Sequence, residues 1–188
     1  QPPPRPVRQH IGAELLAVVD RLADIPVWIS NDIDDVVWQN ALADALFGEL
    51  SGNVGDDNLV RRWFTLPDAR RRVPEADWPL HSAAYVGHLR ATAARRAGPD
   101  VTTLVADLME CSEEFRLLWA RHDVTDCRLD RIRILHPEVG LVHLSCELLQ
   151  AAHTGLRIMA FVPTEGFDAQ QRLELLRVIG TQRFEPIS

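Results

Sequence analysis

The chain has 188 residues, with 20 basic and 27 acidic side chains and a formal net charge of −7. This length is typical of a single domain, and 46% hydrophobic with 25% charged residues is the composition of a folded globular protein, which excludes a disordered tail. The acidic balance also argues against a segment that binds phosphate backbones, because that affinity comes from basic patches.

The three cysteines, Cys111, Cys127 and Cys146, are widely spaced and odd in number, a pattern typical of thiols in a reducing cytosol. No apolar run approaches the ~20 residues of a membrane helix, and no signal peptide opens the chain. We therefore expect a cytoplasmic protein. Residues 1–8 carry four prolines in their first six positions and predict a linker, so we expect the domain itself over residues 9–188.

The first half of the domain predicts one helix, a hairpin and then several helices. Apolar residues at helical spacing favour a helix over 11–24, and two short β runs flank a turn at 31–34. Asn40 and Ser112 have the residue type and position of helix N-caps, and so has Asp77 ahead of Trp78 and Pro79. The predicted elements are a helix over 11–24, strands over 27–30 and 35–38, and helices over 41–47, 58–73, 78–97 and two stretches up to about 122.

One stripe of the helix over 78–97 is made of small residues, namely Ala83, Ala84, Gly87, Ala91 and Ala94. Small side chains predict the close approach of another element. After about residue 128 the apolar period changes to two, which predicts strands over 128–135, 141–149 and 156–162. A last amphipathic helix is expected over 168–179.

Candidate chemistry is sparse. The chain contains no common nucleotide-binding or catalytic signature. His81 and His88 lie two helical turns apart and could converge on a metal with His122 or His143, but without tight ligand spacing we favour no metal and no cofactor. Arg121, His122 and Asp123 resemble part of a charge relay, yet no nucleophile accompanies them, so we favour His122 as a core histidine. Alternatively, Arg121 and His122 could meet the carboxylate of a bound acid.

Eight aromatic residues are spread over the hairpin and the helices. They either fill the core or line an apolar small-molecule pocket, and the sequence leaves both interpretations open. They are Trp28, Trp38, Phe47, Trp63, Phe64, Tyr85, Phe115 and Trp119. On the late strands Arg131, Arg133 and Arg157 alternate with apolar residues, and we expect cross-strand ion pairs on an outer sheet face, with a partner surface as the alternative.

Several motifs in this order resemble one known family. The most specific are Phe-x-x-Leu-Trp-x-x-His-Asp-Val over 115–124 and His-Pro-x-x-Gly over 136–140. Weaker matches are Pro26–Ile29, Val36–Gly48, Asn58–Phe64 and Asp77–Trp78. Together these segments are similar to the MmyB-like (MltR-like) ligand-binding domain of helix-turn-helix regulators of the xenobiotic-response-element type. Relatives tend to carry a basic–aromatic pair where Ile33 and Asp34 stand, which indicates a ligand other than the family's usual one.

The resemblance implies an α+β, PAS-like fold, in which a five-stranded antiparallel sheet carries helices over one face. It also implies a homodimer that binds a small apolar or acidic ligand, such as a fatty acid, in a hydrophobic PAS-like pocket between the sheet and the helices. A DNA-binding domain is expected ahead of the linker. We therefore expect an effector-sensing domain rather than an enzyme. The alternatives are a pocketless dimerisation or docking module of the same regulator and, less favoured, a hydrolase that uses His122 and Asp123. The expected ligand-binding residues are Trp28, Trp38, Phe47, Trp63, Phe64, Trp119, Arg121 and His122.

Overall fold

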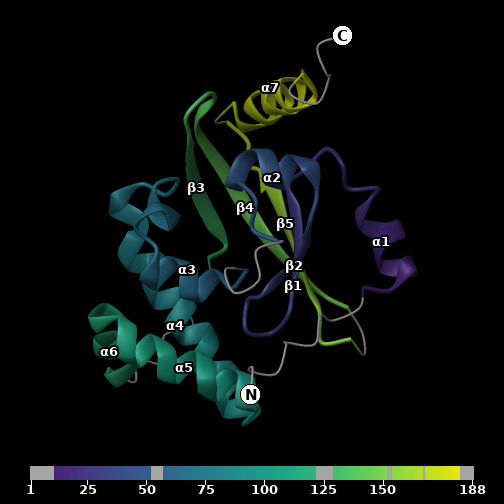
Figure 1. Ribbon diagram of the computed structural model, residues 1–188. Helices are drawn as coiled ribbons and strands as arrows, with labels where there is room; N and C mark the ends of the chain where they lie inside the picture. The colour runs from purple at the N-terminus through teal and green to yellow at the C-terminus, as the bar shows by residue number, and fades with distance from the viewer. Residues whose placement is uncertain (1–10, 52–56, 122–128, 152–153, 167, 183–188) are drawn as a thin grey trace.

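A five-stranded antiparallel sheet forms the centre of the computed structural model, with the strand order β2-β1-β5-β4-β3 (Figure 1). The structure describes residues 11–51, 57–121, 129–151, 154–166 and 168–182. The strands are β1 Val27–Ser30, β2 Val36–Gln39, β3 Arg131–His136, β4 Gly140–Gln150 and β5 Arg157–Pro163. The predicted hairpin and the three late strands are confirmed, and they join where β1 pairs with β5. The fold is the predicted α+β, PAS-like class.

The helices occupy most of the predicted positions. They are α1 Ala13–Val19, α2 Ala41–Phe47, α3 Leu59–Thr65, α4 Trp78–Arg95, α5 Pro99–Cys111, α6 Glu113–Ala120 and α7 Ala169–Gln182, with short 3₁₀ turns η1 Pro67–Arg70 and η2 Glu75–Asp77. The continuous helix predicted over 58–73 is wrong. Leu66 is extended because it precedes Pro67, and a residue before proline is disfavoured in the helical region.

Side-chain caps start three of the helices. Asn40, Asn58 and Ser112 accept hydrogen bonds from the backbone N–H groups of Ala43, Arg61 and Phe115, which satisfies donors that a helix start leaves free. The caps predicted at Asn40 and Ser112 are thus confirmed. Asp77 is the N-cap residue of α4, as predicted, but its side chain makes no capping hydrogen bond.

The Asp77 carboxylate instead receives two hydrogen bonds from the Arg133 guanidinium on β3, at 2.8 and 2.6 Å. An ionised pair of this bidentate kind is stronger than a neutral capping bond, and it ties the start of α4 to the sheet. The pair also holds the pKa of Asp77 below its ordinary value.

Buried apolar residues form three clusters. One lies between the sheet, α2 and α7, a second holds α3 to α6 together, and a third lies between α1 and the opposite face of the sheet. The expectation that helices cover one face alone is therefore wrong. Strand β1 is the reason, because Val27 and Ile29 point to α1 whereas Trp28 points to the other face, so both faces of β1 need cover.

Candidate functional site

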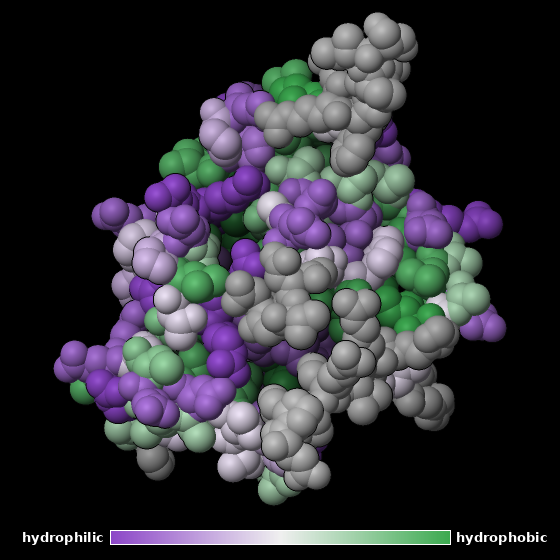
Figure 2. Space-filling view, in the orientation of Figure 1, coloured by the Kyte–Doolittle hydropathy of each residue, from purple (hydrophilic) through white to green (hydrophobic). Residues whose placement is uncertain are grey.

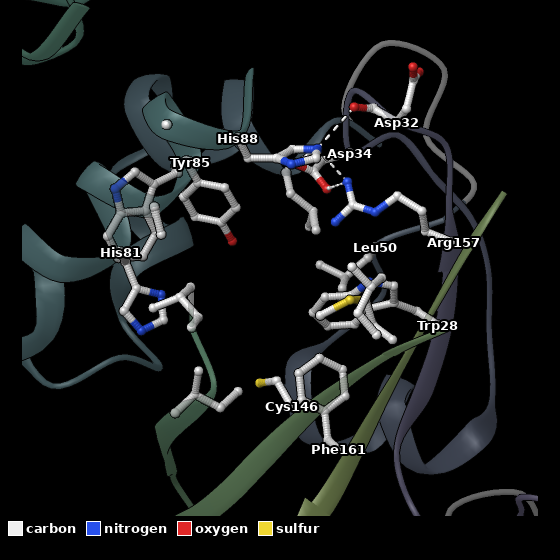
Figure 3. Close-up of a pocket in the computed structure, with 18 of the residues that line it drawn as sticks. Trp28, Asp32, Asp34, Leu50, His81, Tyr85, His88, Cys146, Arg157 and Phe161 are labelled. Carbon is white, nitrogen blue, oxygen red and sulfur yellow. Dashed lines mark hydrogen bonds and ion pairs between the residues drawn. The ribbon is translucent and has the colours of Figure 1, made fainter. Parts of the chain in front are cut away.

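A cavity of about 1610 Å³ lies between the sheet and the helical layer that contains α4. Small-molecule sites usually occupy roughly 300–1,000 Å³, so this cavity has room for a whole small molecule. In the space-filling view, polar residues cover much of the helical layer and apolar residues show in the recesses between them (Figure 2). The walls of the cavity come from the sheet, α2, α3 and α4, with a polar cluster at one end (Figure 3).

The small-residue stripe of α4 faces this space. Ala84, Gly87, Ala91 and Ala94 all line the cavity. Four of the five small residues of the stripe therefore face an open space rather than a closely packed element. Their missing side-chain volume keeps the space between α4 and the sheet open.

An aromatic group forms the wall on the sheet side. Trp28 of β1 lies edge-on to Phe47 of α2, with the ring centroids 5.0 Å apart, and 4.5 Å from Phe161 of β5. Phe47 and Phe161 are themselves 4.8 Å apart. All three line the cavity, and Cys146 of β4 continues the wall (Figure 3). Burial raises the pKa of the Cys146 thiol to about 12, so this wall is uncharged at neutral pH.

The opposite wall carries polar aromatic groups from α4. His81 is 5% exposed and stacks on Trp63, with the rings 5.2 Å apart. Burial lowers the pKa of His81 to about 4, so its ring is neutral at pH 7. The Tyr85 hydroxyl points into the cavity from the same helix (Figure 3), and burial raises the pKa of this phenol. This wall offers hydrogen-bonding groups without charge.

One end of the cavity is charged. Asp34 places one carboxylate oxygen 3.3 Å from Nη1 of Arg157 and the other 3.7 Å from Nε2 of His88, and Nη1 also contacts the His88 ring. Burial lowers the pKa of His88, which Asp34 partly opposes. The predicted cross-strand ion pairs are wrong for Arg133 and Arg157, because both arginines bind carboxylates outside the sheet.

The turn between β1 and β2 presents Asp34 to this end. Asp34 has φ 66°, a left-handed conformation that aspartate tolerates better than most residues. Nδ2 of Asn58 donates to the Ile33 carbonyl and to Oδ1 of Asp35, both at 2.7 Å. On the far side of the turn, Arg96 donates to both carboxylate oxygens of Asp32. The turn is therefore held to the start of α3 by hydrogen bonds and to the C-terminal end of α4 by an ion pair.

The structure brings three of the eight predicted site residues to the cavity, namely Trp28, Phe47 and Trp63. The other five lie elsewhere. Trp38 packs against the α1 cluster on the opposite face of the sheet. Phe64 and Trp119 pack around Phe115 inside the helical layer, with ring distances of 5.3 and 5.4 Å. Arg121 is exposed beyond the end of α6, and His122 lies outside the described residues, as does Asp123.

The three residues of the charged cluster, Asp34, His88 and Arg157, were not predicted as ligand-binding residues. Asp34 was visible only as a departure from the family pattern, and Arg157 only as one of three alternating arginines. His88 was a candidate metal ligand, and no group of three or more potential ligands occurs in the part of the chain that the structure describes. Asp34 and Arg157 are 123 positions apart by their numbers, so only the folded sheet brings them together.

The chain matches the family model described as the MmyB-like transcription regulator ligand binding domain over residues 11–176. It therefore belongs to this family, and its role is that of an effector-sensing domain of a transcription regulator. The family is a class of ligand-binding domains and not a class of enzymes. The comparison with curated proteins gives no match. Across the described ranges, no helix is both long and apolar enough to cross a membrane.

Proposed function

We propose that the domain binds a small apolar or acidic molecule, such as a fatty acid, in the cavity between α4 and the sheet. The proposal rests mainly on the shape and the lining of this cavity. Aromatic rings of Trp28, Phe47 and Phe161 form an apolar wall, and a charged cluster closes one end. Ligand sites typically combine such an apolar lining with a few polar groups that fix orientation.

Binding would act on transcription through the arrangement of two copies of the domain. A ligand shifts an equilibrium only when it has different affinities for the two states. We propose a homodimer in the cytoplasm whose arrangement controls an upstream helix-turn-helix domain, and DNA contact through that domain alone. The size of the cavity favours this proposal over a pocketless docking module. The hydrolase hypothesis gains no support, because both of its residues lie outside the described part of the chain.

Tryptophan fluorescence tests the proposal. The chain has five tryptophans, of which Trp28 and Trp63 line the cavity, whereas Trp38 packs on the other face of the sheet. A bromine-substituted fatty acid quenches indoles that it touches. After delipidation, we expect saturable quenching in the wild-type chain, the same quenching in Trp38→Phe, and most of it lost when Trp28 and Trp63 are both replaced by phenylalanine.

Two results would contradict the proposal. Quenching that never saturates would mean that the acid associates without a site. Saturable quenching that disappears in Trp38→Phe and persists in the double variant would place the ligand on the opposite face of the sheet, against α1.

A further inference from the structure

Buried polar atoms without a partner occur at neighbouring positions of the sheet face that the cavity covers. Among the described residues, Nε1 of Trp28, Oγ of Ser30, Nε of Arg157 and Nε of Arg172 are buried and have no hydrogen-bond partner. Arg172 lies on α7, away from the others. Native proteins leave few such atoms, because a buried donor without a partner loses its hydrogen bonds to water and gains none in the fold. Three such atoms at neighbouring positions therefore indicate that a hydrogen-bonding partner, such as a ligand, is missing from this place.

The three atoms belong to neighbouring positions of the sheet. Ser30 of β1 lies directly opposite Arg157 of β5, and Trp28 lies opposite Met159. Side chains two residues apart on a strand share a face, and directly opposite residues have Cβ atoms about 4.5–5.5 Å apart. Trp28, Ser30 and Arg157 thus project from one patch of the face that the cavity covers, as Trp28 and Arg157 show by lining it.

The donor set identifies the kind of partner. The indole N–H of Trp28 and the Nε–H of Arg157 can only donate, and the Ser30 hydroxyl can donate as well. The missing group is therefore an acceptor with several lone pairs. In the described residues, the contacts of the Arg157 guanidinium all involve Nη1, which meets Asp34 and His88. The edge of the guanidinium formed by Nε and Nη2 makes none of these contacts. Its two parallel N–H groups have the geometry that binds both oxygens of a carboxylate.

We propose that Arg157, Trp28 and Ser30 form the head-group site for a monocarboxylate whose apolar body lies along Phe47 and Phe161. The inference rests on the proposed function and names the chemistry of its ligand. It assigns the anchoring role to Arg157 rather than to Arg121 or His122. Since the three atoms are buried, the carboxylate reaches them only when neighbouring side chains move.

Asp34 limits the charge of the head group. Its side chain is 9% exposed and already faces the Arg157 side chain, which is 12% exposed. One carboxylate can still share the guanidinium through the other edge. Together with Asp34 and Arg157, a bound carboxylate leaves a net charge of −1, whereas a dianionic phosphate leaves −2, and the additional buried charge is costly. The site therefore selects a monocarboxylate over a phosphate ester of the same chain length.

Calorimetry with tetradecanoate, methyl tetradecanoate, tetradecanol and tetradecyl phosphate tests the inference on the delipidated chain. Because hydrogen bonds to a charged group are stronger than hydrogen bonds to a neutral one, we expect the acid to bind at least about tenfold more tightly than the ester and the alcohol. The phosphate should also bind more weakly than the acid, because it buries an additional negative charge. Trp28→Phe keeps the ring and removes the donor, and Ser30→Ala removes only a hydroxyl. Each variant should weaken acid binding about three- to tenfold more than it weakens ester binding.

Matched controls separate this inference from the proposed function. Arg157→Lys keeps a cation for Asp34 but lacks Nε, and should lose the preference for the acid, whereas Arg133→Lys, outside the cavity, should keep it. Equal affinity of the wild-type chain for acid and ester, or equal losses of both in Trp28→Phe and Ser30→Ala, would overturn the head-group site and leave the cavity as a ligand site. Binding of none of the four compounds would overturn the proposed function and the head-group site together.

Discussion

At the scale of single residues, surroundings decide what one side chain can do. His81 and His88 lie on the same helix and look equivalent in the sequence. In the fold, His81 stacks on Trp63, whereas His88 faces the Asp34 carboxylate and the Arg157 guanidinium. The sequence identifies both as titratable groups, but their partners come from β1–β2, α3 and β5. No local pattern could have distinguished them.

The neutral, buried state of His81 makes stability depend on pH. Its pKa is about 4 in the fold, against an ordinary value of 6.5. The unfolded chain therefore binds the additional proton between these values, and stability falls as pH is lowered through that window. We expect about 2 kcal/mol less stability from this group at pH 5 than at pH 7.

Urea unfolding of the wild-type chain and of His81→Gln, each at pH 7 and pH 5, checks this prediction. The variant lacks the titrating ring, so its loss on acidification should be smaller by that amount. An identical pH dependence in the two proteins would contradict the assignment of this loss to His81.

At the scale of elements, local chemistry predicted most of the starts and ends. Strand period and asparagine or serine caps gave β1 to β5 and the beginnings of α2 and α6 in the right places, because these signals involve neighbours within four residues. The position of Asp77 at the start of α4 was predicted, but the partner of its side chain was not, since Arg133 lies on a distant strand. Trp38 and Trp119 show the same limit, because aromatic character does not reveal which face of an element meets the cavity.

Asn58 connects two elements, and its replacement tests this connection. Its side chain caps α3 by accepting from Arg61 N–H at 2.8 Å and holds the β1–β2 turn through Ile33 and Asp35. We expect Asn58→Ala to cost about 2–3 kcal/mol, of which the cap is about 1 and the unpaired turn groups are the rest.

Asn58→Ser keeps the cap and removes the two bonds to the turn, so denaturant unfolding should place it between the wild-type chain and Asn58→Ala. If the serine and alanine variants were equally unstable, the cap would contribute nothing, and the division of the stability loss between cap and turn would be wrong.

At the scale of the whole molecule, the resemblance to a PAS-like family predicted the sheet and the ligand-binding role. The resemblance also implied a ligand cavity, but its size was not predictable, because an empty space depends on how far apart two layers lie. Residues of the β1–β2 turn bridge these layers, with Asp32 paired to Arg96 and Asp34 to Arg157. We therefore expect ligand binding to restrict the motion of this turn and of α4 more than that of other parts of the fold.

Hydrogen–deuterium exchange with and without tetradecanoate checks this expectation. Groups that become ordered exchange more slowly, so we expect slower exchange in residues 31–35 and in α4. Exchange in α1, on the other face of the sheet, should be unchanged and serves as the internal control. Slower exchange in α1 with none in the turn would contradict the proposed coupling.

The small-residue stripe of α4 has a consequence for how such domains diverge. Ala84, Gly87, Ala91 and Ala94 contribute little packing, and the space beside them is the space that a guest molecule would fill. Enlarging one of these side chains would shorten the longest guest that fits while leaving the caps and strand pairs intact. Single substitutions along this face of α4 would therefore set the length of ligand that fits, so relatives can acquire new effectors while the rest of the fold stays the same.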